Sequence, residues 1–509
     1  MKRLSKSRYT AYCQCPKSLW FGVYHPELAP MIDPAAQARF TAGSAVGELA
    51  KQLFPGTVDV TTLNNECGLD LSAMLEKTQR LLADSTTNVI AEAAFSYKSC
   101  YCAVDLLRRE DGGWAIYEVK STSTKGDDGQ QAKFDKYLPD IAYQTWMLQQ
   151  CGINVTSINL VCIDSNYVRH GKLNPQQLFA IIDMREALRD ELAKVPAGVS
   201  DALKVLSVEC EPEAKLSERC VEPYECPFME YCMIEEDIPQ DWESVFDLYR
   251  MSFAQKMKHY RAGRVTMKDM RGQVLSPVQQ IQIDCTLGDK EHIDREGIRS
   301  FLDGLSYPLC FLDFETMQDA IPQFDGTRPY QQIPFQYSLH IKPSADAPYE
   351  HREYLAPSNG CDPRRTLAEQ LCRDIPCGVC TLAYNMKFEK GRIREMADMY
   401  PDLAAHLMDI HDGIRDLLVP FQSGFYYVPA MKGSFSIKRV LPALFPNDRS
   451  LDYHNLTGVH NGGEAMTIFP KIKNMSPTDA AAAREALLRY CELDTWAMVK
   501  VWEKLRELA

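Results

Sequence analysis

Two carboxylates and a lysine lie in one short stretch of the chain in which two strands are expected to pair. The stretch SCYCAVDLLRREDGGWAIYEVKSTS has two apolar runs separated by residues 110–113, which are typical of a tight turn. A hairpin would bring Asp105 close to Glu118 and Lys120, and the last two share a face because they are two residues apart. Two carboxylates can hold a divalent cation, and a neighbouring ammonium can orient an attacking water or offset charge on a phosphorane. A solvated ion pair on a strand is the alternative.

The order of polar residues around this hairpin resembles that of the PD-(D/E)XK nucleases. The resemblance is to the RecB-like branch that includes the iron–sulfur exonucleases of CRISPR adaptation, and it covers most of residues 1–235. It implies four catalytic residues, of which the last lies in the helical segment DIAYQTWML: Asp105, Glu118, Lys120 and Gln144. It also implies that Asp105 and Glu118 hold the metal together with an upstream ligand on the first core helix. There GSAVGELAKQLF offers Glu48 in place of the histidine usual in RecB.

Four of the 18 cysteines stand at the two ends of this region. QCPKSLW contains Cys15, and CVEPYECPFMEYC contains Cys220, Cys226 and Cys232. In the branch named above, one cysteine before the nuclease core and three after it hold a [4Fe–4S] cluster, so the resemblance implies such a cluster here. The spacing C-x5-C-x5-C departs from the family's C-x2-C-x5-C, and Cys13 is a rival to Cys15. A tetrahedral zinc site or unliganded thiols are the alternatives.

A second group of acids lies in the last 200 residues. The strings LCFLDFET and VCTLAYNMKFEKGRI place Asp313 and Glu315 at the end of an apolar strand and Glu389 at the start of a helix. ALLRYCELDTWAMVKVWEKL has the pattern of an amphipathic helix, on which Tyr490 and Asp494 share a face because they are four residues apart. An ordinary amphipathic helix with unrelated acids would give the same pattern.

By order and context, residues 307–509 resemble the DEDD 3′–5′ exonucleases, which have an RNase H-like fold. Glu389 stands where the N-x-x-x-D motif has Asp, and the Y-x-x-x-D form of the last motif indicates the tyrosine subclass. The resemblance implies two-metal phosphodiester hydrolysis in which Tyr490 positions the attacking water. Four carboxylates would hold the ions: Asp313, Glu315, Glu389 and Asp494.

Two further stretches offer basic or aromatic side chains to a nucleic acid. KMKHYRAGRVTMKDMRG resembles a helix-hairpin-helix turn, but a solvated linker helix fits it equally well. Its basic residues include Lys256, Lys258, Arg261 and Arg264. FQSGFYYVPAMKGSFSIKRVLPALFP has three aromatic residues that either stack on unpaired bases or pack under a loop, and three basic residues that could contact phosphates. These six are Phe425, Tyr426, Tyr427, Lys432, Lys438 and Arg439; three histidines without ligand spacing receive no role, namely His411, His454 and His460.

The elements that must position these residues belong to an ordinary globular chain. Of its 509 residues, 45% are hydrophobic and 25% charged, and the net charge of −13 argues against a purely electrostatic nucleic-acid coat protein. No apolar run approaches the roughly 18 residues that a membrane helix needs. No apolar h-region follows the basic N-terminus, so we expect no signal peptide. We therefore expect no membrane association and a cytoplasmic location, and the resemblances imply an α/β fold. The expected divisions are a PD-(D/E)XK restriction-endonuclease-like domain (1–235), a helical linker (236–306) and an RNase H-like domain (307–509).

Together the motifs predict a metal-dependent nuclease with two phosphodiester-hydrolysing modules. The arrangement resembles a bacterial family that fuses a RecB-like iron–sulfur nuclease to a DEDD exonuclease. The resemblance implies a nucleic-acid substrate with a free or unpaired end, DNA rather than RNA, in repair or defence. Sites made of oxygen ligands favour Mg²⁺ or Mn²⁺. Two alternatives stay open: a nucleic-acid-binding platform with weak catalysis, and an RNA-processing 3′–5′ exonuclease.

Overall fold

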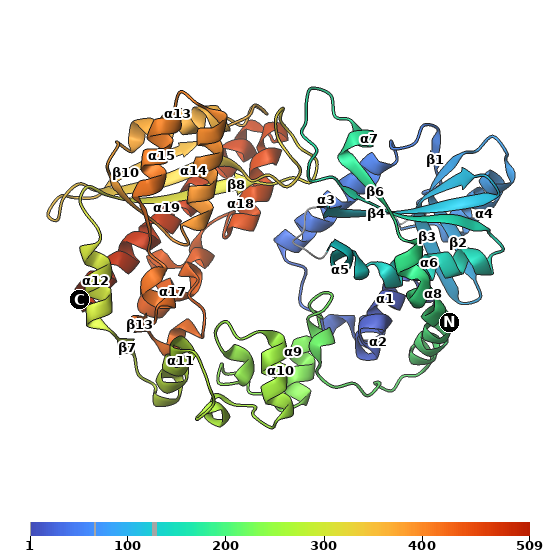
Figure 1. The fold of residues 1–509 in the computed structure, drawn as a ribbon, viewed down its shortest axis with the longest axis horizontal. Coiled ribbons are helices and arrows are strands. Elements are labelled where there is room, and N and C mark those ends of the chain that lie inside the picture. The colour runs from blue at the N-terminus through green and yellow to red at the C-terminus, as the bar shows by residue number, and fades with distance from the viewer. Residues whose placement is uncertain (1, 66–67, 125–129) are drawn as a thin grey trace. The chain divides into compact units, whose positions relative to one another are not determined.

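The computed structural model describes residues 2–65, 68–124 and 130–509 and has a mixed α/β fold (Figure 1). The chain divides into two compact units. The first extends to Asp237 and also includes Asp319–Gln331; the second comprises Ile238–Gln318 and Gln332–Ala509. Residues 238–306, which we expected to form a linker of their own, therefore belong to the second unit.

The first unit is built on a six-stranded sheet whose order follows the chain. Its strands are β1 (Thr57–Asp59), β2 (Val89–Tyr97), β3 (Cys100–Glu110), β4 (Gly113–Ser123), β5 (Val155–Ile163) and β6 (Phe179–Asp183). The antiparallel pairing of β3 with β4 confirms the expected hairpin. Strands β4 and β5 are parallel, so the connection between them crosses over, and it contains the helix that carries Gln144.

Helices cover both faces of this sheet. They are α1 (Lys6–Gln14), α2 (Pro16–Tyr24), α3 (Pro34–Ala50), α4 (Leu71–Ala83), α5 (Gln130–Asp135), α6 (Leu138–Gln150), α7 (Pro175–Leu178), α8 (Arg185–Ser207) and α9 (Met229–Glu235). Alternate strand residues supply two apolar cores, as the two-residue period of a strand requires. Leu107 and Ile116 pack into the core that includes α1, α4, α6 and α8, whereas Leu106 and Tyr117 pack into the core with α3.

The second unit contains a five-stranded mixed sheet in the order β10-β9-β8-β11-β12. Its strands are β8 (Leu309–Met317), β9 (Ile333–Lys342), β10 (Glu350–Leu355), β11 (Cys380–Ala383) and β12 (Ile414–Asp416), and β7 (His292–Ile293) pairs separately with β13 (Tyr426–Tyr427). Its helices are α10 (Phe253–Arg261), α11 (Pro277–Gly288), α12 (Arg295–Asp303), α13 (Arg364–Asp374), α14 (Lys387–Met399), α15 (Ala404–Gly413), α16 (Val419–Gln422), α17 (Ile437–Leu444), α18 (Gly462–Ile468) and α19 (Pro477–Leu508).

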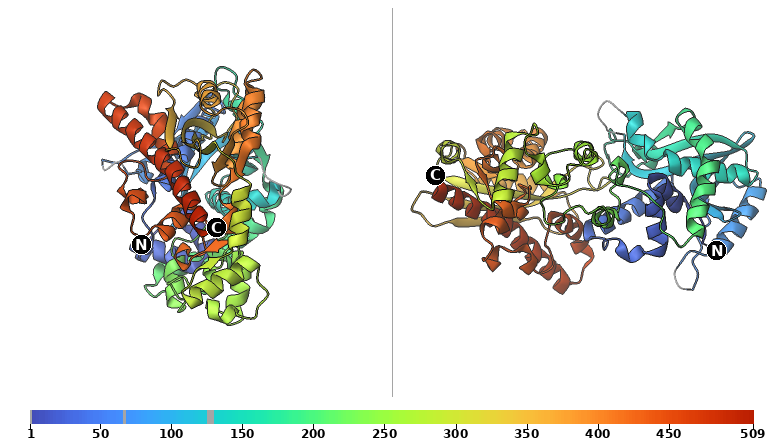
Figure 2. Two further views of the ribbon diagram at one scale, coloured as in Figure 1. Left: turned by 90° about the vertical axis from the view of Figure 1, so that its left-hand side faces the viewer. Right: turned by 90° about the horizontal axis from the view of Figure 1, so that it is seen from below.

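The two faces of strand β8 differ, because one is apolar and the other carries Asp313 and Glu315. Cys310, Leu312 and Phe314 belong to the core that β8 and β9 share with α13, α14 and α15. The intervening residues face α19, the long red helix of Figures 1 and 2: the ring of Phe311 packs against Trp502 of that helix. Asp313 and Glu315 therefore lie on the α19 side of the sheet, and their predicted common face is confirmed.

The two stretches that were expected to offer basic or aromatic side chains to a nucleic acid are partly buried in the structure. Helix α10 forms as expected, but residues 267–270 form a short 3₁₀ turn, so the second helix of the expected helix-hairpin-helix is absent. The Lys256 ammonium donates to the Phe246 carbonyl at 2.5 Å. Tyr426 and Tyr427 are only 2% and 1% exposed, which favours packing over base stacking for these two rings. None of the described helices has the length and apolar composition needed to cross a membrane.

Candidate functional sites

Glu118 is the centre of a charged cluster in the first unit. The side chain lies on β4 and is fully buried. Its Oε1 accepts from the Lys120 ammonium at 2.6 Å and from the Lys6 ammonium at 2.9 Å. Its Oε2 accepts from Nε2 of Gln144 on α6 at 2.8 Å. The structure thus brings Glu118, Lys120 and Gln144 together, and it adds Lys6 of α1, which the sequence analysis did not single out.

Two more carboxylates complete this cluster. Asp140 lies one helical turn before Gln144 on α6, and it accepts from the Lys120 ammonium at 2.6 Å and from Gln144 at 3.1 Å. Asp105 is held on the neighbouring strand by the backbone N–H of Val119, which donates to Oδ2 at 2.7 Å. The Lys6 ammonium lies 3.7 Å from Asp140 and 3.8 Å from Asp105, so it faces all three carboxylates.

Charge and burial act in opposite directions on these acids. Burial and the nearby Glu118 charge raise the pKa of Asp105 to about 7. Burial also opposes ionisation of Glu118, but the ammonium groups of Lys120 and Lys6 hold its pKa well below the usual value. The Oε1 atom of Gln144 is buried without a hydrogen-bond partner in the described part of the chain. Carboxylates with an unused amide oxygen beside them form a donor set suited to a hard cation.

The upstream acid differs from the expectation. Glu48 is exposed, with 71% of its side chain accessible, and it pairs at 2.5 Å with Lys51, the residue directly after α3, rather than joining the contacts around Glu118. Glu92 of β2 is nearer to the cluster: it has a left-handed backbone with φ of 56° and no paired residue on β3, while the β2–β3 register is the same on either side of it. Burial raises its pKa, and the charges of Lys6 and Glu118 act on it. A single acid within the apolar run VIAEAAF was the available signal.

The four cysteines implied by the resemblance line one small pocket in the first unit. Cys15 directly follows α1, and the other three come from the segment that ends in α9: Cys220, Cys226 and Cys232. Cys13 instead packs against the α1–α8 core, where burial raises its pKa to about 11. The structure therefore places Cys15, not Cys13, with the three later cysteines.

The surroundings of this pocket suit a group bound by thiolates. Leu216, Phe228 and Met229 supply apolar walls, and Lys17 and Arg219 supply positive charge. Burial raises the pKa of the Cys232 thiol to about 12, and the neighbouring cysteines act in the same direction. Neighbouring thiols become thiolates more readily when a cation neutralises their charge. Four cysteines that line one pocket supply the ligand type that an iron–sulfur cluster or a zinc ion needs, although no three of their Sγ atoms, all in described residues, lie within 4.8 Å of one another.

In the second unit the structure gathers the four expected acids. Asp313 and Glu315 come from β8, Glu389 from the first turn of α14 and Asp494 from the middle of α19. Burial and the other acids raise the pKa values of Asp313 and Glu315 well above their usual range. Ligand atoms of Asp313, Glu315 and Cys491 lie within 4.8 Å of one another. We call Asp313, Glu315, Glu389 and Asp494 the four-acid site.

The position of Glu389 is fixed by the turn that precedes α14. Asn385 has a left-handed backbone with φ of 67°. Its N–H donates to Oδ1 of Asp416 at 2.9 Å, and the N–H of Met386 donates to Oδ2 of the same carboxylate at 3.3 Å. Asp416 at the end of β12 thus holds the turn that leads into the helix that presents Glu389. Sequence reasoning missed this role of Asp416, because it depends on a strand pairing between distant segments.

Two tyrosines and a lysine border the acids. The Tyr453 hydroxyl donates to Oδ1 of Asp494 at 2.6 Å. The Lys438 ammonium donates to the Tyr490 hydroxyl at 2.8 Å, so Lys438 points into the site instead of outward as a free phosphate contact. A Cβ atom on Gly462 would lie 3.6 Å from Oε2 of Glu315, so the chain passes close to the acids there.

The donor set of the four-acid site fits divalent cations. All its ligands are carboxylate oxygens, which Mg²⁺ and Mn²⁺ prefer. Oε2 of Glu389 is buried and has no hydrogen-bond partner in the described part of the chain. Burial raises the pKa of Glu389 to about 8, with the Asp416 charge acting in the same direction. Unpartnered carboxylates of this kind are expected where a cation completes the set.

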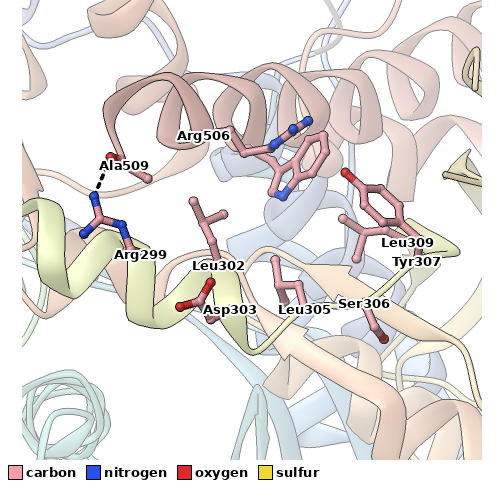
Figure 3. A pocket seen from close by; sticks show the side chains of 10 residues that line it. Arg299, Leu302, Asp303, Leu305, Ser306, Tyr307, Leu309, Arg506 and Ala509 are labelled. Carbon is pink, nitrogen blue, oxygen red and sulfur yellow. Dashed lines mark hydrogen bonds between the residues drawn. The ribbon is translucent and has the colours of Figure 1, made fainter. Parts of the chain in front are cut away.

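A separate hollow of about 230 Å³ lies between α12 and the end of α19 (Figure 3). Arg299, Tyr307 and Trp502 line it, and the Arg299 guanidinium donates to the Ala509 carbonyl at 2.9 Å. None of the four acids lines this hollow, so it is distinct from the four-acid site.

Comparisons with known proteins match parts of this chain. A family model described as "Domain of unknown function (DUF2779)" matches residues 310–436. The chain is similar to "Uncharacterized protein MG366 homolog" of Mycoplasma pneumoniae, with 23% identity over 293 residues, which cover 51% of this chain and 42% of that protein. It is also similar to "Uncharacterized protein UU173" of Ureaplasma parvum, with 25% identity over 221 residues, 39% of this chain and 31% of that one. The match thus spans less than half the length of either relative.

Without metal, the stability of the second unit is expected to fall as pH rises, and bound metal is expected to restore it. Carboxyls with raised pKa values hold protons in the folded state that the unfolded chain releases, so stability falls as pH rises through the window. For Glu389 this window runs from about 4.5 to about 8. In chelator at pH 8, Asp313→Asn is expected to raise the Tm by roughly 2–4 °C, equivalent to about 1 kcal/mol.

Thermal unfolding in EDTA and in Mn²⁺ checks this prediction. Mn²⁺ is expected to raise the Tm of the wild type and to have less effect on Asp313→Asn, which lacks one ligand. Asp346→Asn, which removes an exposed acid of the same unit, is the matched control. Equal Tm values for Asp313→Asn and the wild type in both buffers would contradict the prediction.

Lys6 is expected to act as a counter-ion for the carboxylates around Glu118. Lys6→Met should destabilise the metal-free first unit by about 1–3 kcal/mol, because a buried charge loses one of its two cations. Mn²⁺ should restore more of the Tm in the variant than it adds to the wild type. The exposed Lys98→Met is the control, and an unchanged Tm of Lys6→Met in chelator would show that Lys6 is not needed for charge balance.

Proposed function

We propose that the chain is a metal-dependent nuclease with two phosphodiester-hydrolysing modules that act on DNA with free or single-stranded ends. The observation that carries this proposal is the four-acid site. Four carboxylates from β8, α14 and α19, separated by up to 181 residues from Asp313 to Asp494, lie together in a buried position. Such a set suits two cations that clamp the attacking and leaving oxygens of a phosphodiester.

The chain's own groups have defined parts in the second module. Asp313, Glu315, Glu389 and Asp494 would hold the cations. Tyr453, which donates to Asp494, fixes that carboxylate. Tyr490, whose oxygen accepts from Lys438, is held at the edge of the acids, where it can orient a water for attack. The mixed sheet order and the position of α19 across its polar face support an RNase H-like fold and a DEDD exonuclease of the tyrosine subclass.

The first module would use the cluster around Glu118. Asp105, Glu118 and Glu92 are the carboxylates suited to a cation, and Gln144 holds Glu118 in place. Lys120 donates to both Glu118 and Asp140, so its ammonium is aligned beside the carboxylates where a phosphate would enter. The hairpin, the parallel strand after it and the Gln-bearing crossover helix support a PD-(D/E)XK fold. Glu48 has no part in this version of the site.

A [4Fe–4S] cluster in the four-cysteine pocket would brace this module. Cys15 and the segment from Cys220 to Cys232 lie about 200 residues apart in sequence, so a shared cluster closes a long loop. Helix α1 carries Lys6 in its first turn and ends at Cys15. The cluster would therefore hold the helix that places Lys6 against Glu118.

Cleavage assays with isosteric variants test the two active sites. Single-stranded DNA, duplex DNA and RNA, each labelled at the 3′ or the 5′ end, are incubated with Mn²⁺. Asp494→Asn is expected to lower release from 3′ ends by about 100-fold or more and to spare the other activity, and Asp105→Asn should do the reverse. The exposed acids give matched controls, Glu485→Gln on α19 and Asp190→Asn on α8.

The outcomes separate the proposal from its alternatives. Binding of the substrates without cleavage of any of them would contradict the nuclease and favour a binding platform. Cleavage of RNA alone would replace the DNA substrate with RNA. Loss of both activities through either single variant would contradict two independent sites.

The cluster has its own test. Protein purified without oxygen is expected to be brown and to contain four iron and four sulfide per chain, and Cys226→Ser should remove the colour and most of the iron. Cys210→Ser, an exposed cysteine ten residues before Cys220, is the control and should keep both. A colourless protein with one zinc that Cys226→Ser removes would contradict the iron–sulfur assignment.

A further inference from the structure

Two histidines and a glutamate converge in the second unit without any part in the four-acid site. His340 on β9 and His351 on β10 are directly opposite each other in the antiparallel register, and their ring centroids lie 4.5 Å apart. Glu492 of α19 places its Oε1 3.8 Å from Nδ1 of His351. Ligand atoms of the three side chains lie within 4.8 Å of one another.

A chain of hydroxyl groups fixes which ring nitrogens carry protons. The Thr495 hydroxyl donates to the backbone carbonyl of Glu492 at 3.1 Å, and a carbonyl can only accept. Thr495 Oγ1 must then accept from its two other neighbours, Ser338 Oγ at 2.6 Å and His340 Nδ1 at 2.9 Å. Ser338 has thereby used its proton, so it accepts from Nε2 of His351 at 2.9 Å. We assign protons to Nδ1 of His340 and Nε2 of His351 on this ground.

This assignment leaves a lone pair on Nε2 of His340 and another on Nδ1 of His351. The latter faces the Glu492 carboxylate, and two electron pairs 3.8 Å apart repel each other unless a cation lies between them. We propose that His340, His351 and Glu492 bind Zn²⁺, with water as a fourth ligand. Histidine ligands whose second nitrogen donates to a fixed acceptor are typical of zinc sites, and two histidines with one glutamate are a known ligand set.

The chemistry of the ligands separates this site from the four-acid site. Imidazole nitrogens favour Zn²⁺, whereas the carboxylates of Asp313 and its partners favour Mg²⁺ or Mn²⁺. The site is also accessible from solvent, because the side chains of His351 and Glu492 are 25% and 51% exposed. His340 is buried, and its ring packs beside that of Trp496, with the ring centroids 5.2 Å apart.

Zinc at this position would tie α19 to β9 and β10. Glu492 lies midway between Tyr490 and Asp494 on that helix, so the tie would fix the segment that presents both residues to the four-acid site. The site itself does not depend on the proposed nuclease activity. A zinc site could exist in a chain that cleaves nothing, and the test below uses metal binding alone.

Zinc content and thermal stability of the full-length chain test the proposal. Metal-stripped protein is loaded with Zn²⁺ in excess Mg²⁺, and bound zinc is counted by elemental analysis. The wild type is expected to retain one more zinc per chain than His351→Ala or the exposed-ligand variant Glu492→Gln. His454→Ala, another exposed histidine, should match the wild type. Taking differences between variants cancels zinc held by the cysteines.

The hydroxyl chain gives a second and sharper readout. Thr495→Val should weaken the binding of this zinc by about 10–100-fold, whereas Thr495→Ser should keep wild-type affinity, because only the hydroxyl orients the histidines. Zn²⁺ should raise the Tm of the wild type more than that of Glu492→Gln. Equal zinc content and equal Tm shifts in the wild type, His351→Ala and Glu492→Gln would overturn the proposal and leave a proton shared by His351 and Glu492.

Discussion

Four carboxylates brought together from β8, α14 and α19 lose much of their hydration and repel each other. A protein interior holds such a group only when protons or cations neutralise it. Without metal, this constraint raises the pKa values of Asp313 and Glu315. It also accounts for Oε2 of Glu389, which is buried without a hydrogen-bond partner in the described part of the chain. The fold around the site keeps the acids together in spite of their repulsion, and in the proposed function cations would complete this arrangement.

The two units balance buried acid charge differently. Around Glu118, the ammonium groups of Lys6 and Lys120 lie within hydrogen-bond distance, and that carboxylate stays ionised. In the four-acid site, hydroxyl groups contact the acids instead: Tyr453 donates to Asp494, and Lys438 reaches the acids through Tyr490. Around Glu118, a metal cation would have to share the carboxylates with the two ammonium groups or displace them. In the four-acid site, burial and mutual repulsion raise the pKa values of the acids while the Lys438 charge opposes this, so a bound cation would compete with protons. The two modules are therefore expected to differ in metal affinity even though both use carboxylates.

Single helices connect the sites within each unit. Helix α1 contacts Glu118 through its first turn and reaches the four-cysteine pocket at its end, so the proposed cluster and the charge balance of Glu118 would act on one helix. Helix α19 presents Tyr490 and Asp494 on one side, and Glu492 near the two histidines on another. Because a helix transmits position along its length, a ligand at one of these places restricts the side chains at the other. The similarity to a family of unknown function covers residues 310–436 and ends before α19, so the helix that completes the site lies beyond the matched segment.

Local sequence patterns determined the elements that carry the acids. Three patterns depend only on neighbours in the chain: the alternation in LCFLDFET, the turn residues between β3 and β4, and the amphipathic period around Tyr490. The strand, the hairpin and the helix that they predicted were all confirmed. Only the tertiary structure decided that Glu48 is exposed and paired with Lys51 while Glu92 lies near Glu118. It also decided that Lys6 joins the first cluster and that His340 lies opposite His351. These contacts join residues from different elements, and their geometry follows from strand register and helix docking. Those depend on the packing of the whole core, which no local pattern of residue types specifies.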